Sequence, residues 1–294
     1  MRNLKEWQIS SRTNYMKSLT DKQKEYLENG FYIERNVFDT KDMEEIFINF
    51  YDICFNIALK HNIKHKTPIP NNVSYPNNLK DLDYLVLAIF NVNKDLLGEV
   101  YDTFSYSLTF MRFLGNKKVE NITQELLNIN KTSSLYGWTN RMRIDLPADE
   151  RRTYGWHQEI FYTIPDTKFV QTWCPMMRDT TIENGTIEIK RGSHKEGIAK
   201  QSWNEIEGRA TQIIIDPEIT NKYKTIQLEM KVGDILFFDG HLAHKSGKNS
   251  TKDEVRFSLV GMWNDPSYEG FKAPLPNFLS RTISAKEYFN QIMD

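Results

Sequence analysis

A histidine and a glutamate lie two positions apart in residues 154–162, which read Tyr-Gly-Trp-His-Gln-Glu-Ile-Phe-Tyr. This aromatic-rich composition favours a β-strand. Side chains at positions i and i+2 of a strand point to the same face, so we expect His157 and Glu159 to project together. A second histidine from a distant strand would complete a set of two histidines and one carboxylate. Such a set leaves coordination positions open and suits non-haem Fe(II) and its oxygen chemistry.

The bare pattern His-x-Asp/Glu is weak evidence, because six histidines and 39 acidic residues in 294 positions produce such matches by chance. A second match, His194-Lys-Glu196, follows Arg191-Gly-Ser and precedes a glycine, which indicates a turn. Residues in a turn need not share a face. The setting therefore favours His157, although an ordinary half-buried histidine remains the alternative at that position.

A second chemically suggestive segment covers residues 231–249. Its apolar run at residues 235–238 is typical of a buried strand, and His241 and His244 follow where that strand ends. Either histidine is well placed to bind a metal at the mouth of a barrel. Arg256 begins the next apolar strand, and its planar guanidinium suits a carboxylate bidentately. A structural salt bridge or a position on a surface edge is the alternative for this arginine.

The elements that position these residues change in type near residue 135. Before it, helical patterns predominate: Thr20 to Gln23 resembles a capped helix start, and Asn29-Gly30 resembles its end. After it, short β-type runs alternate with turn residues. We expect helices at 20–30, 40–54, 94–114, 119–129 and 284–293, and strands at 31–33, 140–146, 154–162, 169–177, 186–190, 212–215, 225–230, 234–238 and 255–263.

About eight strands after residue 135 favour a sandwich or barrel, and helices without a closed core of their own are expected to brace it. We therefore expect one domain over residues 1–294: a helical part at 1–134, a β core at 135–265 and a tail with a short helix at 266–294. The fold class is mainly β with flanking helices (α+β). The apolar and aromatic shares of 39% and 13% supply a sizeable core.

The net charge and the distribution of apolar residues limit the kinds of molecule that the protein is expected to bind. A net charge of −1 disfavours a nucleic-acid-binding protein, which usually shows a basic excess. The apolar runs are too short to span a bilayer, and residues 1–10 contain no apolar signal core. Cys54 and Cys174 are expected to be free thiols. We expect a cytoplasmic protein that acts on a small molecule, without nucleic-acid or membrane partners.

The order and spacing of these segments resemble the phytanoyl-CoA dioxygenase family over roughly residues 20–265. The resemblance is carried by residues 20–37, by the Trp-His-Gln-Glu motif at 156–159, by Asn-Gly at 184–185 with Gly-Ser-His at 192–194, and by Gly-Asp at 233–234 through His244 to Arg256. It implies a double-stranded β-helix (a jelly-roll or cupin-like barrel) that uses Fe(II), 2-oxoglutarate and O2.

The resemblance also implies residue roles. His157, Glu159 and His244 would bind the metal, with His241 as the competing ligand, and Arg256 would hold the distal carboxylate of 2-oxoglutarate. Lesser contacts to 2-oxoglutarate would come from Ser246, Gln158 and Trp173. No catalytic residue is implied beyond the metal ligands. The chain departs from the family pattern at Glu159, where aspartate is usual, and at Arg191, where proline is frequent.

The sequence says less about the substrate. Arg141, Arg143 and Asp145 alternate along an expected strand and so share a face. If that face is inward, the arginines could bind a substrate anion or 2-oxoglutarate; otherwise they are a solvated face. Trp156 and Tyr162 could line the pocket. The resemblance implies a dioxygenase that hydroxylates a small polar metabolite and releases succinate and CO2. A cupin-like metal enzyme independent of 2-oxoglutarate, or a catalytically silent metal-binding protein, is the alternative.

Overall fold

The computed structural model describes residues 19–149, 153–162, 167–205 and 212–273. Its helices are α2 (Asp21–Asn29), α3 (Thr40–Lys60), α4 (Leu79–Val92), α5 (Leu96–Ser105), α6 (Leu108–Leu114), α7 (Lys117–Leu127) and α8 (Pro217–Asn221). Its strands are β1 (Phe31–Glu34), β2 (Tyr136–Asp145), β3 (Phe169–Met176), β4 (Ile187–Lys190), β5 (Gln201–Asn204), β6 (Gln212–Ile215), β7 (Thr225–Gln227), β8 (Ile235–Asp239), β9 (His244–Ser246) and β10 (Arg256–Asn264).

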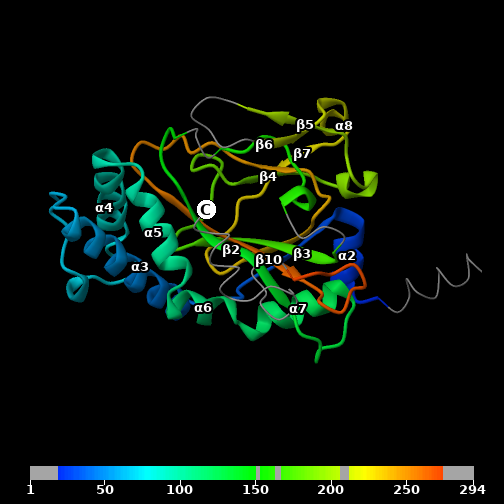
Figure 1. Cartoon of the computed structure of the whole chain (residues 1–294), viewed down its shortest axis with the longest axis horizontal. Coiled ribbons are helices and arrows are strands. Elements are labelled where there is room, and N and C mark those ends of the chain that lie inside the picture. The colour runs from blue at the N-terminus through cyan, green and yellow to red at the C-terminus, as the bar shows by residue number, and fades with distance from the viewer. Residues whose placement is uncertain (1–18, 150–152, 163–166, 206–211, 274–294) are drawn as a thin grey trace, which may run out of the picture.

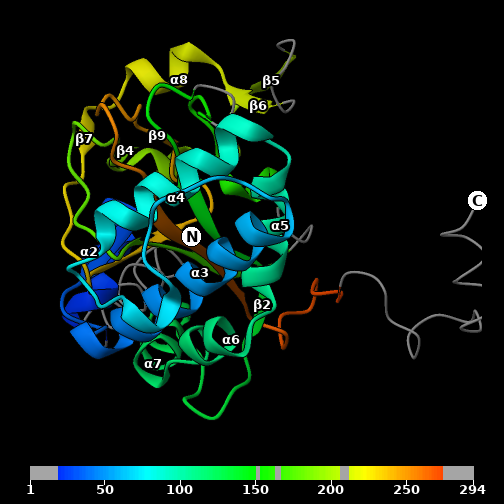
Figure 2. The ribbon, with the colours of Figure 1, turned by 90° about the vertical axis from the view of Figure 1, so that its left-hand side faces the viewer.

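The strands form a larger antiparallel sheet in the order β1-β8-β3-β10-β2 and a smaller one in the order β7-β4-β9. Strands β5 and β6 pair as a separate hairpin. Helices α3 to α7 lie on one side of the larger sheet and the smaller sheet lies on the other (Figure 1). Figure 2, viewed from the side of α3 and α4, shows these helices in front of the strands. This two-sheet, jelly-roll-like arrangement with flanking helices confirms the expected fold class.

Successive side chains of the central strands point to opposite faces of the larger sheet, and this explains why the helices pack on one face and the smaller sheet on the other. In β8, Phe237 packs into the core shared with the helices, whereas Leu236 and Phe238 pack toward β4 of the smaller sheet. In β3, Cys174 faces the helices and Trp173 faces the smaller sheet. Each fully buried large side chain contributes about 1.5–3 kcal/mol. The site described below lies on the second face, between the sheets.

Local signals correctly predicted several boundaries. Helix α2 begins with a capping box: the Thr20 side chain accepts a hydrogen bond from the Gln23 backbone, and the Gln23 side chain accepts one from the Thr20 backbone. The helix ends at Gly30, which has a φ of 82°. Cys54 and Cys174 are free and buried, as expected. In the part of the chain that the structure describes, each helix is too short or too polar to cross a membrane.

Other expectations need correction. The single helix expected over 94–114 is divided, because the side chain of Ser107 accepts from Phe110 N and starts α6 as a separate helix. The strand expected over 225–230 ends at Gln227. Strands β5 and β9 were not expected. The helix expected at 284–293 lies outside the described residues, and the single-domain division stays a prediction.

Candidate active site

His157 and His244 are held side by side by the backbone. They form an isolated antiparallel bridge in which each amide donates to the other's carbonyl, with N–O distances of 3.0 and 3.1 Å. His244 also pairs with Ile189 of β4, so the bridge attaches His157 to the edge of the smaller sheet. The two imidazole centroids lie 4.2 Å apart. Two residues that are 87 positions apart in sequence are thereby fixed as neighbours.

Glu159 completes a buried three-residue group with these histidines. Its Oε2 lies 3.4 Å from Nε2 of His244 and 3.8 Å from Nε2 of His157. The Nδ1 atoms point the other way, 2.7 Å from the Gly155 carbonyl and 2.9 Å from the Leu242 carbonyl. These carbonyls accept the Nδ1 protons and leave both Nε2 lone pairs facing the carboxylate. Histidines that bind metals are oriented in this way.

The electrostatics of the group favour the metal-binding protonation states. Burial, together with the neighbouring His244, lowers the pKa of His157 to about 3. Burial raises the pKa of Glu159, but the contact with His244 and the electrostatic influence of His244, His157 and Arg141 outweigh it, so that pKa lies below its usual value. Near neutral pH, His157 is therefore neutral and Glu159 is ionised. Their mutual distances suit one cation with nitrogen and oxygen ligands.

The expected strand at residues 154–162 is wrong. His157 forms only the isolated bridge, and Glu159 begins a 3-10 helix, η2 (Glu159–Tyr162). The aromatic composition is typical of a strand, yet the chain turns immediately after His157. The carboxylate and imidazole meet because the turn brings Glu159 back over the bridge, not because alternate residues share a strand face.

The other candidate histidines lie outside this group. Nδ1 of His241 is 2.9 Å from a carboxylate oxygen of Asp239, and its side chain is about one-third exposed. His194 lies in a 3-10 helix, with Nε2 3.0 Å from the Leu27 carbonyl. Within the described residues, the structure thus places His244, rather than His241, with His157 and Glu159.

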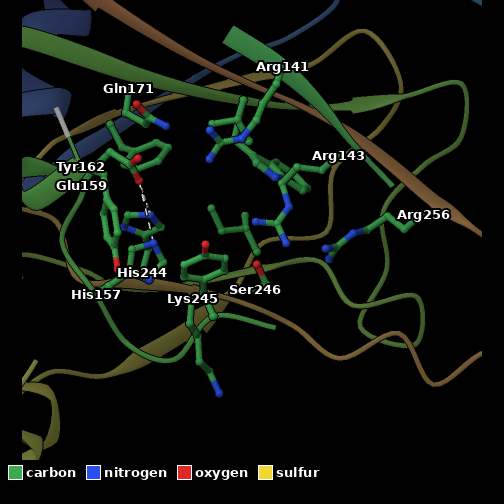
Figure 3. Close-up of a pocket in the computed structure, with 15 residues that line it drawn as sticks. Arg141, Arg143, His157, Glu159, Tyr162, Gln171, His244, Lys245, Ser246 and Arg256 are labelled. Atoms are coloured by element: carbon green, nitrogen blue, oxygen red, sulfur yellow. Dashed lines mark ion pairs between the residues drawn. The ribbon is translucent and has the colours of Figure 1, made fainter. Parts of the chain in front are cut away.

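A pocket opens beside the three-residue group, between the two sheets (Figure 3). Its lining comes from β2, β3, β4, β8, β9, β10 and the 154–162 segment: Arg141, Arg143, Tyr154, His157, Glu159, Tyr162, Gln171, Trp173, Ile187, Phe238, His244, Lys245, Ser246, Arg256 and Val260. The inward alternative for Arg141 and Arg143 is thus the one that the structure shows. The pocket combines an apolar wall with several convergent polar groups, as small-molecule sites do.

Arg256 is the most deeply buried cation of the pocket, with 1% of its surface exposed. Its Nη2 lies 2.7 Å from Asp145, while Nε and Nη1 are buried without a hydrogen-bond partner. Asp145 also pairs with Arg143 at 2.9 Å, and the two arginines hold the pKa of this carboxyl well below its usual range despite its burial. A buried guanidinium with two unused donors is suited to bind a carboxylate.

The remaining expected site residues divide into those that line the pocket and those that do not. Ser246, Trp173 and Tyr162 line it. The side chain of Gln158 instead binds backbone groups, donating to the carbonyls of Gly197 and His241 and accepting from Ala199 N. Gln158 is therefore not among the residues that line the pocket, and it holds together the loops that carry the proposed metal ligands, so its contact with 2-oxoglutarate stays a prediction.

Trp156 also lies outside the pocket lining. Its ring packs against two lysines, with Nζ of Lys190 4.7 Å and Nζ of Lys245 5.1 Å from the ring centroid. Sequence reasoning missed Gln171 as a lining residue. The signal was its position two residues before Trp173 in one strand, which places both on the same face.

Sequence comparisons identify related proteins. A sequence model of the phytanoyl-CoA dioxygenase family matches residues 26–258. The 1-deoxypentalenic acid 11-beta-hydroxylase of Streptomyces arenae is 30% identical over 127 residues, which is 41% of this chain and 44% of the relative. A phytanoyl-CoA dioxygenase domain-containing protein 1 homolog of Dictyostelium discoideum is 36% identical over 76 residues, 25% of this chain and 27% of the relative. The chain thus spans less than half the length of these curated relatives.

Solved structures share the fold at low sequence identity. The epimerase SnoN, in complex with Fe3+, α-ketoglutarate and nogalamycin RO, superposes with a TM-score of 0.57 at 16% identity, over 90% of this chain and 92% of SnoN. The non-haem monooxygenase ThoJ superposes with a TM-score of 0.53 at 17% identity, over 84% of this chain and 78% of ThoJ. At these identities the superpositions establish the architecture alone.

Proposed function

Because the chain belongs to the phytanoyl-CoA dioxygenase family, we propose that it is a non-haem Fe(II)- and 2-oxoglutarate-dependent oxygenase whose metal is bound by His157, Glu159 and His244. The single observation that carries this proposal is the buried group itself. All three ligand atoms lie within 4.8 Å of one another, and both histidines are oriented by backbone carbonyls. Two imidazoles and one carboxylate leave positions open for a co-substrate and O2.

The adjoining residues fit 2-oxoglutarate, which is α-ketoglutarate. The buried Nε and Nη1 of Arg256 have no hydrogen-bond partner, and their N–H groups are available to the distal carboxylate. Asp145 fixes the third nitrogen of that guanidinium, so the arginine is oriented before the ligand arrives. Ser246 and Trp173 line the same pocket and provide a hydroxyl and an apolar wall.

With these groups bound, Fe(II), 2-oxoglutarate and O2 supply an oxidising reaction that releases succinate and CO2. The chain's own contribution is to orient the reactants and to exclude water from the site. We infer that the reaction is the hydroxylation of a small polar metabolite. The curated relative named an 11-beta-hydroxylase supports this inference, and the epimerase fold relative makes rearrangement the competing outcome.

The first experiment compares histidine variants of the full chain. His157→Ala and His244→Ala should each abolish the visible absorption that Fe(II) and 2-oxoglutarate give together under anaerobic conditions. His241→Ala is the matched control, because this side chain pairs with Asp239 outside the group and should leave the band intact. Loss of the band in His241→Ala alone would overturn the ligand assignment. A wild-type protein that binds Fe(II) but gives no band would favour a metal enzyme independent of 2-oxoglutarate.

The second experiment separates the co-substrate from the metal. Arg256→Gln should weaken 2-oxoglutarate binding by at least about 100-fold, because charge-assisted hydrogen bonding to the distal carboxylate is lost. Metal affinity should stay within about threefold, since Arg256 is not among the metal-binding residues. Equal affinity for 2-oxoglutarate in the wild type and the variant would contradict the role of Arg256. Calorimetric titration of the metal-free proteins with Mn(II) measures metal affinity, and titration of the Mn(II)-loaded proteins with 2-oxoglutarate measures co-substrate affinity.

A further inference from the structure

The pocket contains more positive charge than the metal and 2-oxoglutarate require. Three guanidinium groups line it, those of Arg141, Arg143 and Arg256. Two carboxylates oppose them, Glu159 in the lining and Asp145 between two of the arginines. Three cations against two anions leave one positive charge. Fe(II) and the 2-oxoglutarate dianion cancel each other, so this excess persists when both are bound.

Lys245 does not add to this excess. Its Nζ lies 3.2 Å from Glu188 and faces the ring of Trp156. Figure 3 shows this side chain extending away from the pocket, whereas Arg141 and Arg143 extend into it. The lysine is therefore neutralised outside the cavity.

The excess charge resides at Arg141. Arg143 and Arg256 share the carboxylate of Asp145. Arg141 has no ion-pair partner among the residues that the structure describes, and it is exposed to solvent at the pocket. A ligand that enters the pocket meets this guanidinium on the metal side.

An independent observation on β3 points to a ligand at the same place. Gln171 lines the pocket, is 1% exposed, and its Oε1 is buried without a hydrogen-bond partner. Val260 lies opposite both Arg141 and Trp173 in the register, so Arg141 and Trp173 share a face across three strands, roughly 10 Å apart. Gln171 is two residues from Trp173 on that face. Figure 3 shows the Gln171 and Arg141 side chains on the same side of the pocket.

A buried amide oxygen without a partner costs free energy that a bound donor recovers. We propose, on the basis of the oxygenase function above, that the substrate is a small anion that also carries a hydroxyl or N–H group. Its carboxylate or phosphate pairs with Arg141, and its donor binds Oε1 of Gln171. The two contacts fix the charged end of the substrate and leave the remainder facing the metal.

Four probes with one three-carbon skeleton test the proposal: glycerol, propionate, glycerate and glycerol 3-phosphate. The full chain is loaded with Mn(II) and 2-oxoglutarate without O2, and each probe is titrated by calorimetry. Glycerate should bind at least about ten times more tightly than glycerol, because a charge-assisted contact is gained. It should also bind more tightly than propionate, which lacks hydroxyl groups. Whether glycerate or glycerol 3-phosphate binds better identifies the anion as carboxylate or phosphate.

Variants assign the contacts to residues. Arg141→Gln should remove the advantage of glycerate over glycerol, and Arg141→Lys should retain part of it. Gln171→Leu should remove only the advantage of glycerate over propionate. The matched control is Arg112→Gln, which removes an exposed arginine of α6 that pairs with Glu45 of α3, and this change should alter no probe affinity.

The 2-oxoglutarate affinity of the same proteins separates two kinds of failure. If the wild type does not bind 2-oxoglutarate, the proposed function fails. If it binds 2-oxoglutarate but does not distinguish glycerate from glycerol, the anion proposal alone is refuted. The anion proposal is also overturned if Arg141→Gln weakens 2-oxoglutarate binding as strongly as Arg256→Gln, since Arg141 would then serve the co-substrate.

Discussion

Replacing Glu159 by aspartate, the residue usual in the family pattern, should impair the metal site of this chain. The substitution removes one methylene and withdraws the carboxylate by roughly 1.5 Å, the length of one C–C bond. Oε2 of Glu159 is already 3.4 and 3.8 Å from the two Nε2 atoms. Metal–ligand bonds tolerate deviations of only about 0.2 Å. The shortened side chain therefore cannot reach a cation that both histidines bind.

The backbone is unable to compensate for this loss. Gln158, the preceding residue, is anchored by three hydrogen bonds to Gly197, His241 and Ala199. On the other side, Ile160 N donates to the Gly240 carbonyl. We therefore expect Glu159→Asp to weaken metal binding by at least about 100-fold, the upper end of the effect of losing an outer partner of a metal ligand.

The assay is competition for Co(II) or Mn(II) against a chelator of known affinity, at neutral pH. Glu159→Gln is the matched variant, because it keeps the length of the side chain and removes its charge. Both variants should bind metal weakly, one for geometric and one for electrostatic reasons. An aspartate variant within about threefold of the wild type would refute the reasoning, since it would mean that the backbone at this turn follows the shorter side chain.

Two further predictions concern buried carboxylates. Asp145→Asn leaves Arg143 and Arg256 without their shared anion and should lower the free energy of unfolding by about 3–5 kcal/mol; urea denaturation measures this, and a loss below about 1 kcal/mol would contradict it. Burial raises the pKa of Asp83 to about 6 although Arg178 pairs with it at 2.7 Å. The protonated form therefore favours the folded state, and its contribution, complete below pH 4, is lost as the pH rises through 6. Relative to Asp83→Asn, wild-type stability should fall by about 2–3 kcal/mol from pH 4 to 7, and identical pH profiles in denaturant titrations would exclude this effect.

Sequence reasoning succeeded where a single segment contains the whole signal. The capping box of Thr20 and Gln23 and the left-handed Gly30 define α2 from local interactions alone. The alternation of Arg141 and Arg143 correctly placed both on one face. Which face was inward depended on the packing of the smaller sheet against the larger one, and residues distant in sequence determine that packing.

Sequence reasoning failed where the pairing of distant segments, rather than local amino-acid composition, determines the secondary structure. Residues 154–162 have the composition of a strand, but within them only His157 forms a β-bridge, and a 3-10 helix begins at Glu159. The short β9 has a polar sequence, yet it is a strand because Ile187 and Ile189 of β4 pair with it. The unsatisfied amide of Gln171 is a property of the packed interior, and no spacing in the sequence indicates it.

The reciprocal bridge between His157 and His244 has a kinetic consequence. Because each amide donates to the other residue's carbonyl, neither histidine can swing away without breaking the hydrogen bonds of both. Opening of this edge would separate the two histidines, so it could not occur while both held a metal ion. A bound ion at 100 times its Kd opposes that event by about 2.7 kcal/mol. The rate at which these two amide protons exchange with deuterium should therefore report metal occupancy. This measurement requires neither turnover nor knowledge of the substrate.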